Sequence, residues 1–258
     1  MPGSARDDAR QFLPGSRLRT WLRAAPGKAL GLFTGAYQTE SLADANTGLG
    51  RREYVPGSEL DAMPYASICR IWSDTSEGSG FVAGPGLVLT AAHVLHNALS
   101  RTVTFADGLE FTVGSDSFAI HPSYQSEGDR FDIAAIRLDP QALAGRQPIA
   151  ILTASDELTE RSECEVAGYA AGFATMVRHR VSGARNAEGE FAVRTSGGQV
   201  HHRIDTSRGQ SGAPILVRPG NGSGTFAAIG VHTYGKGNMK PGLLNHGTAF
   251  PVSGFASP

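Results

Sequence analysis

The chain has 258 residues with a formal net charge of -1, 40% hydrophobic residues, 33 glycines and 14 prolines. This charge balance gives no indication of a nucleic-acid groove or a membrane-binding surface. The hydrophobic content is enough for one large domain or two small ones, and the many glycines and prolines favour short strands and turns.

The first 50 residues have a different texture from the rest of the chain. They are rich in Arg, Ala and Gly and show no sustained apolar alternation. Their longest apolar run, at 29–33, is shorter than the core of a signal peptide and far shorter than the ~20 residues of a membrane span. We interpret residues 1–50 as a leader, pro-segment or flexible arm, and the absence of a visible Sec-type signal leaves the compartment open.

Short runs rich in Val, Ile, Phe and Thr recur between turn clusters from residue 64 onward. They cover 65–72, 79–84, 86–91, 102–106, 110–115, 133–138, 164–170, 174–181, 190–196, 200–206, 214–218 and 225–234. This spacing is typical of β-barrels or sandwiches rather than of alternating strands and helices. A break at 140–147 divides the runs into two sets, so we predict an all-β protein with one β-domain at 51–146 and another at 147–258.

Two cysteines, Cys69 and Cys164, are too few for a disulfide framework and lack any metal-ligand spacing. Two separate buried thiols are the favoured interpretation. A single bridge stays open, since both residues lie in strand-like segments and the sequence does not give their separation. We expect no metal and no cofactor.

Three separate segments carry the parts of a nucleophilic catalytic site. A serine hydroxyl needs a base, a carboxylate that orients the base, and N–H donors for an oxyanion. His93 follows the apolar run at 86–91, Asp132 begins the run at 133–138, and Ser211 lies in "SRGQSGAP" after Gly209. Each residue alone has an ordinary structural explanation, as a surface histidine, a strand cap or a turn. The order His, Asp, Ser is what indicates catalysis.

Four motifs together resemble the chymotrypsin-fold serine endopeptidases, and more closely the bacterial V8-like glutamyl endopeptidases. They are "GSGFVAGPGLVLTAAHVL", "IHPSY…FDIAAIRL", "DTSRGQSGAP" and "IGVHTYG", and the resemblance covers roughly residues 51–250. It implies two six-stranded antiparallel Greek-key barrels with the active site in the cleft between them. It also implies protein or peptide substrates and a secreted, monomeric enzyme, with no nucleic acid, membrane or cofactor as partner.

The resemblance assigns a role to each candidate residue. His93 is the general base, Asp132 orients it, Ser211 attacks the scissile carbonyl, and the N–H groups of Gly209 and Ser211 form the oxyanion hole. Asp129 is a rival for the orienting role, but it lies in the turn "EGDR", whereas Asp132 directly precedes the apolar run.

The resemblance also places Thr206, His232, Thr233 and Gly235 at the S1 pocket. An imidazole and a hydroxyl donate hydrogen bonds to a carboxylate, so these residues predict a preference for Glu at P1. Asp205 indicates a different P1 preference, because it lies where trypsin-like enzymes keep the acid that binds Arg or Lys. We favour the carboxylate interpretation and keep Arg or Lys specificity, as in a processing or effector protease, as the alternative.

One position departs from the wider family. Gln210 stands where trypsin-like zymogens have the Asp that receives the new N-terminal ammonium, so that activation switch is absent. V8-like enzymes bring their mature N-terminus near S1, which here would require processing near 46–50, where no cleavage site is evident. A third hypothesis, a binding module of this fold with weak turnover, is disfavoured by the complete triad.

Overall fold

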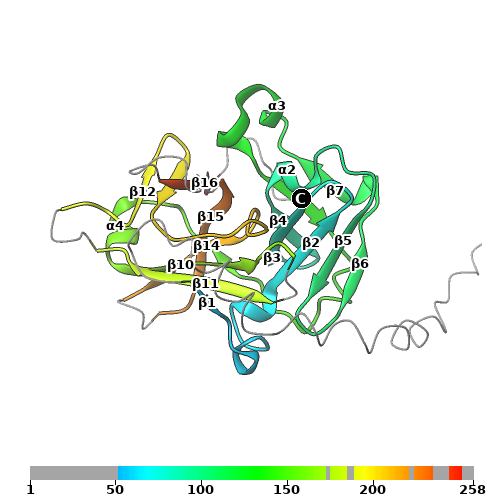
Figure 1. Cartoon of the computed structure of the whole chain (residues 1–258), viewed down its shortest axis with the longest axis horizontal. Coiled ribbons are helices and arrows are strands. Elements are labelled where there is room, and N and C mark those ends of the chain that lie inside the picture. The colour runs from blue at the N-terminus through cyan, green and yellow to red at the C-terminus, as the bar shows by residue number, and fades with distance from the viewer. Residues whose placement is uncertain (1–51, 173–174, 185–188, 221–223, 235–243, 252–258) are drawn as a thin grey trace, which may run out of the picture. The chain divides into compact units, whose positions relative to one another are not determined.

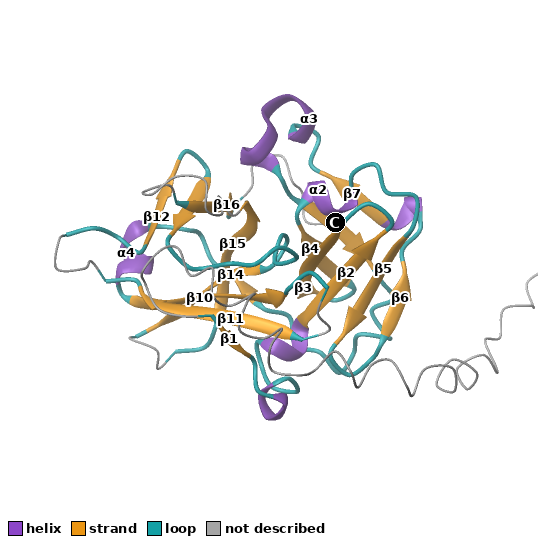
Figure 2. Ribbon diagram, in the orientation of Figure 1, coloured by secondary structure: helices purple, strands orange, loops and turns teal. Residues whose placement is uncertain are grey.

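The computed structural model describes residues 52–172, 175–184, 189–220, 224–234 and 244–251. Residues 1–50, expected to be a leader, pro-segment or flexible arm, lie outside this part, and so does Gly235 of the expected pocket. The described residues form two antiparallel sheets joined by short helices and turns (Figure 1, Figure 2). The expected all-β class is confirmed.

The first sheet has seven strands among the described residues, in the spatial order β6-β5-β2-β3-β4-β8-β7. The strands are β2 (Ile68–Ser73), β3 (Glu77–Gly84), β4 (Leu87–Thr90), β5 (Arg101–Phe105), β6 (Glu110–Thr112), β7 (Phe118–Ile120) and β8 (Ala134–Arg137). Every neighbouring pair is antiparallel. In β5, Val103 and Phe105 are buried while Thr102 and Thr104 are half-exposed, which is the alternation expected of a strand with one face on a core.

The second sheet has nine strands among the described residues, in the order β1-β11-β10-β14-β15-β16-β13-β12, with β9 pairing in parallel with β15. The strands are β1 (Glu53–Tyr54), β9 (Ala150–Ile151), β10 (Ser162–Tyr169), β11 (Met176–Ser182), β12 (Val193–Ser196), β13 (Gln199–His202), β14 (Pro214–Pro219), β15 (Ala227–Tyr234) and β16 (Asn245–Ala249). The resemblance implied six strands in each sheet. The described sheets are larger because short segments extend them, such as the two-residue strands β1 and β9.

The helices among the described residues are short and lie between strands. They are η3 (Gly57–Glu59), η4 (Tyr65–Ser67), α2 (Ala92–Leu95), η5 (Ser115–Ser117), α3 (Tyr124–Glu127), η6 (Gly128–Phe131) and α4 (Asp156–Glu160). In the part of the chain that the structure describes, no helix is long and apolar enough to cross a membrane. Two of them matter for the site, because α2 follows β4 and η6 precedes β8.

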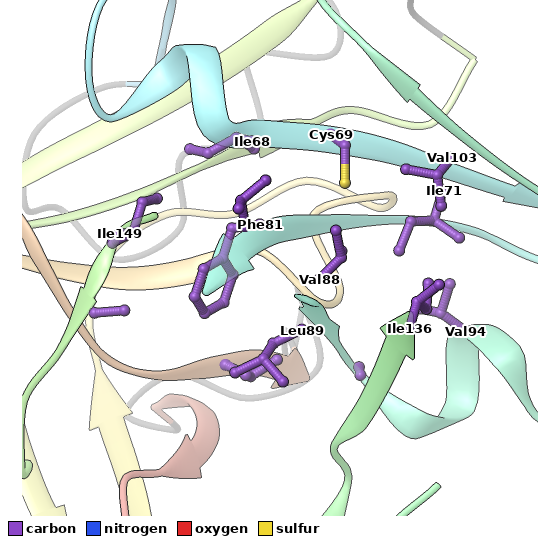
Figure 3. Packing of buried hydrophobic residues seen from close by; sticks show 14 of the residues in the cluster. Ile68, Cys69, Ile71, Phe81, Val88, Leu89, Val94, Val103, Ile136 and Ile149 are labelled. Carbon is purple, nitrogen blue, oxygen red and sulfur yellow. The ribbon is translucent and has the colours of Figure 1, made fainter. Parts of the chain in front are cut away.

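The buried hydrophobic side chains form two clusters. The first lies mainly on the first sheet and extends to side chains of β10, β11, β14 and β15, and the second lies on the second sheet. Figure 3 shows part of the first core, in which Phe81 and Val88 from β3 and β4 lie among Ile68 and Ile71 of β2 and Ile136 of β8. The second core contains branched side chains from β10, β14 and β15 together with residues of the segment after β13, among them Val166, Ile204, Ile215 and Ile229. Branched side chains pack well on a pleated sheet, which explains why these segments form strands.

The two cysteines are free thiols on different sheets. Cys69 lies in β2 and Cys164 in β10, and both are completely buried. Burial raises the pKa of each thiol to about 12, so both are neutral and inert at ordinary pH. The interpretation as two separate buried thiols is confirmed.

Strand β3 of the first sheet contacts the second sheet directly. The Ser79 N–H donates to the Ser211 carbonyl at 2.7 Å. The Ser79 hydroxyl donates to the Gly209 carbonyl at 2.9 Å and accepts from the Tyr169 N–H at 2.9 Å. A side chain at Gly78 would lie 2.9 Å from the Ser211 carbonyl oxygen, so this close approach of the backbones requires glycine there. The contact fixes the position of the 206–211 loop against β3.

Replacing Ser79 by alanine tests this contact. Ser79→Ala leaves the buried Tyr169 N–H and Gly209 carbonyl without their hydroxyl partner, and an unmade buried hydrogen bond costs about 1–3 kcal/mol. We expect the free energy of unfolding in urea to fall by that amount. Ser115→Ala is the control, because that hydroxyl is exposed and bonds only to Asp116. Equal stability of the two variants would contradict the role given to Ser79.

Candidate active site

His93 and Asp132 form a two-point contact. The His93 backbone N–H donates to Asp132 Oδ1 at 2.9 Å, and His93 Nδ1 lies 2.6 Å from Asp132 Oδ2. The Asp132 side chain is 6% exposed and the His93 side chain 34%. Because an ionised carboxylate only accepts hydrogen bonds, Nδ1 carries the proton and Nε2 keeps its lone pair. The ring is thus held in the tautomer that a general base needs.

Local structure explains why these two side chains meet. His93 lies on α2, directly after β4, and Asp132 follows η6, directly before β8. Strands β4 and β8 are antiparallel neighbours, with Thr90 opposite Ala134, so the end of one strand and the start of the other lie at the same edge. The Thr248 hydroxyl of β16 also lies 3.4 Å from the Asp132 carbonyl oxygen. Asp132 is therefore in contact with the second sheet as well as with His93.

The rival carboxylate, Asp129, points elsewhere. Its side chain is 69% exposed, and its Oδ2 lies 3.4 Å from His246 Nε2. Among the two acidic residues considered from the sequence, Asp132 is the one that contacts His93.

Ser211 lies in the loop between β13 and β14, which two glycines shape. Gly209 and Gly212 both have φ of 89°, a left-handed conformation that strains other residues. A Cβ on Gly212 would lie 2.0 Å from the Ser79 carbonyl oxygen, so no side chain fits there. Between the glycines the half-buried Ser211 presents its hydroxyl, which lies 3.4 Å from the Thr233 carbonyl.

The same loop leaves two backbone donors unused. The N–H groups of Gly209 and Ser211 donate to no acceptor among the described residues, whereas the intervening Gln210 N–H donates to the Ser207 carbonyl at 3.1 Å. The Arg208 carbonyl is turned to the Ala171 N–H at 2.6 Å. Two free donors that flank one hydroxyl are the arrangement that stabilises an oxyanion next to a nucleophile.

The expected S1 residues lie beside this loop. Thr206 is half-buried, and its hydroxyl oxygen accepts from Asn245 Nδ2 at 3.3 Å, which leaves the hydroxyl hydrogen available to another acceptor. His232 is buried on β15, and backbone hydrogen bonds with Gly212 and Ala213 join it to the end of the loop. The buried Thr233 hydroxyl lies 3.3 Å from the His246 carbonyl.

His232 is part of a buried pair of histidines. Its Nδ1 lies 3.2 Å from His202 Nε2 on β13. Burial, followed by the nearby His246 and His93, lowers the pKa of His232 to about 3. Burial and the adjacent His232 also hold the pKa of His202 well below its ordinary value. Both rings are therefore neutral at ordinary pH, and His232 offers a hydrogen bond without a charge.

The rival specificity residue, Asp205, is also buried. Its backbone N–H donates to His179 Nδ1 at 2.6 Å, and its Oδ2 lies 3.8 Å from the same nitrogen. The carboxylate therefore has an imidazole of β11 as a neighbour within the protein.

His202 and Asn245 were not identified from the sequence. His202 supports His232, and Asn245 contacts Thr206 as well as the Ile204 carbonyl. The signal for His202 was the alternation in "VHHRI", where Val200, His202 and Ile204 share the buried face. Within the described ranges, no group of three or more His, Cys, Asp or Glu side chains is placed to hold a metal ion.

Comparison with known proteins identifies a family. The family model described as Trypsin matches residues 62–257. Among solved structures, a Glu endopeptidase is 22% identical over 78% of this chain and 92% of its own, with a TM-score of 0.60. The serine protease of a human pathogenic astrovirus is 19% identical over 74% and 93%, with a TM-score of 0.50. A protease of M. tuberculosis H37Rv in an inactive form is 19% identical over 77% and 92%, also at 0.50.

None of the proteins with curated functions matches the chain. The structural similarities, at these identities, concern the fold. The family match is of another kind, because it spans well over half of the chain and includes the first sheet, every strand of the second except β1, and all three candidate catalytic residues. The chain belongs to the trypsin family, and it is a serine endopeptidase of the chymotrypsin-like fold.

Proposed function

We propose that this peptidase cleaves protein or peptide substrates through an acyl-enzyme on Ser211 and prefers Glu at P1. Two observations carry the specificity: the buried, neutral imidazole of His232 lies on a strand that is hydrogen-bonded to the loop holding Ser211, and the half-buried Thr206 lies in that loop with its hydroxyl hydrogen available. Similarity to a structure named as a Glu endopeptidase supports the same preference.

The proposed formation of the acyl-enzyme uses His93 Nε2, the Ser211 hydroxyl and the two free N–H groups of the loop. His93 Nε2 takes the proton of Ser211 Oγ as this oxygen attacks the scissile carbonyl, and Asp132 stabilises the imidazolium that forms. For this step the hydroxyl turns from the Thr233 carbonyl toward His93. The Gly209 and Ser211 N–H groups bind the oxyanion. His93 then protonates the leaving amine as the peptide C–N bond breaks. In the second half, His93 takes a proton from a water molecule that attacks the acyl carbon, and it returns this proton to Ser211 Oγ as the acyl-enzyme bond breaks.

The P1 side chain meets donors without a full positive charge. A Glu carboxylate accepts from the Thr206 hydroxyl and from His232, and these bonds are stronger than neutral ones because the acceptor is ionised. A Gln amide loses that strengthening, and a Lys ammonium brings donors to donors. A shorter Asp side chain leaves its carboxylate away from the donors.

Covalent labelling tests the nucleophile. A fluorophosphonate should label the wild-type chain, and Ser211→Ala should remove the label because no other group is assigned this role. His93→Ala should slow labelling by at least about a hundredfold, since general-base catalysis contributes on the order of 10² to 10⁴. Peptide mapping locates the adduct. Equal labelling of wild type and Ser211→Ala would refute the assignment.

Cleavage of peptides that differ only at P1 tests the specificity. Each pocket donor left without its partner costs about 1–3 kcal/mol, so kcat/KM for Glu should exceed that for Gln and Lys by tens- to hundreds-fold. His232→Ala should lower kcat/KM for Glu far more than for an apolar P1 residue. His201→Ala is the matched control, because His201 alternates with the buried His202 on β13 and is only half-buried.

A preference for a basic P1 residue would contradict the proposal. A preference for Arg or Lys that disappears in Asp205→Ser and persists in His232→Ala would make Asp205 the specificity residue and refute the proposed preference for Glu.

The pH dependence of selectivity tests whether His232 is neutral. With a pKa of about 3, its imidazole stays uncharged until well below the range where a His of ordinary pKa gains a proton. The ratio of kcat/KM for a Glu substrate to that for an apolar one should therefore stay constant from about pH 8 to 5.5, where the P1 carboxylate is ionised. A ratio that rises severalfold on acidification, as an imidazolium forms, would contradict this prediction.

A further inference from the structure

The side chain of Arg52 is buried against the loop that carries the nucleophile. Arg52 is 6% exposed. Its Nη1 donates to the Thr206 carbonyl at 3.0 Å and to the Ser207 hydroxyl at 2.7 Å. These partners are more than 150 positions away in the chain. None of the roles assigned above involves this guanidinium.

The backbone after Arg52 fixes where its side chain reaches. Strand β1 begins at the next residue and pairs with β11, and the Val55 N–H donates to the Met176 carbonyl at 3.0 Å. Strand β11 also contacts the 206–211 loop, because Gln210 Nε2 donates to the Val177 carbonyl at 3.2 Å. Arg52 and Gln210 are thus both positioned relative to β11.

Contacts inside the loop connect Arg52 to the free donors. The Ser207 N–H donates to Gln210 Oε1 at 2.7 Å, and the Gln210 N–H donates to the Ser207 carbonyl at 3.1 Å. Gln210 lies between Gly209 and Ser211, whose N–H groups are free. A shift of Ser207 would therefore move Gln210 and change the direction in which both free N–H groups point.

Stability alone does not explain the burial of this cation. Nε and Nη2 of Arg52 are buried and have no hydrogen-bond partner, and no described carboxylate forms an ion pair with it. Burying a charge without a counter-ion opposes folding, and an apolar side chain of similar size would avoid that cost. The contacts of Nη1 with the loop are what this guanidinium contributes.

We infer that Arg52 is a positioning residue that holds the 206–211 loop in the conformation with the Gly209 and Ser211 N–H groups free. The inference rests on the proposed role of these groups as the oxyanion hole. Because Arg52 is an internal side chain, the loop is held without a new N-terminus. This differs from the processing near 46–50 that the resemblance to V8-like enzymes would require.

The test compares Arg52→Met and Arg52→Lys in the full chain. Arg146→Met is the matched control, because Arg146 is also largely buried and also donates to a backbone carbonyl, that of Ala66, with no contact to the loop. Active-site concentration is titrated with the fluorophosphonate, and kcat and KM are measured on the Glu substrate. Intact mass confirms that the full chain is uncleaved during the assay.

The expected result is a loss specific to the transition state. In Arg52→Met, kcat per titrated site should fall at least tenfold, because a misplaced oxyanion donor costs on the order of 10² to 10³. The KM and the Glu-to-Gln ratio should change less than about twofold. Arg52→Lys should recover part of the loss, and Arg146→Met should keep the wild-type kcat. An unchanged kcat, or a change confined to KM and P1 selectivity, would overturn the inference, as would wild-type turnover seen only after cleavage before Arg52.

Amide hydrogen exchange gives a second measurement that needs no activity. In Arg52→Met, exchange in the peptide that contains Ser207 and Gln210 should be at least tenfold faster than in Arg146→Met. Unchanged exchange would overturn the inference even if the enzyme proved inactive. A wild-type chain without fluorophosphonate labelling would refute the proposed function, while the exchange experiment would still decide whether Arg52 holds the loop.

Discussion

The hydrogen bonds of Ser79 with the 206–211 loop are the contacts on which the site depends. The proposed catalytic groups come from different sheets, with His93 and Asp132 next to strands of the first and Ser211 next to a strand of the second. A triad works only when its members are held within hydrogen-bond reach, so the sheets must be fixed relative to each other to a fraction of an ångström. Ser79, a buried serine on the strand that precedes β4 and α2, donates to the Ser211 and Gly209 carbonyls of the loop and accepts from the Tyr169 N–H of β10, so it joins the two sheets next to Ser211.

The backbone of the nucleophile loop contributes as much as its side chains. Positive φ at Gly209 and Gly212 turns the chain sharply on both sides of Ser211. The Gln210 side chain closes the loop by bonding back to Ser207 and across to β11. This loop keeps two N–H groups free where most buried N–H groups would find an acceptor. Such free donors are costly unless a developing negative charge occupies the position in front of them.

The two buried histidines define the electrostatics of the expected pocket. His232 of β15 and His202 of β13, the two strands that flank β16, lie 3.2 Å apart at their ring nitrogens, and burial keeps both neutral. Under the proposed preference for Glu, an uncharged donor would select a carboxylate by direction and by the cost of unpaired groups rather than by net charge. In the proposed mechanism His93 is then the histidine that accepts a proton, and its Nδ1 lies 2.6 Å from Asp132 Oδ2.

Patterns local in the chain determined much of this protein. Short runs rich in Val, Ile, Phe and Thr predicted the strands β2 to β6, β8 and β10 to β15, because branched and aromatic side chains favour a pleated, buried strand. Motif order led to the proposal of His93, Asp132 and Ser211 as catalytic residues. Strand β16 was missed because "NHGTA" is polar and short, and it is buried only because β13 and β15 flank it. The expected contact of Asp132 with His93 received its geometry from the tertiary structure, which alone decided the pairing of His202 with His232 and the position of Arg52 against the loop. Those contacts join residues 30 to 155 positions apart, and no local pattern records which distant backbone a side chain will meet.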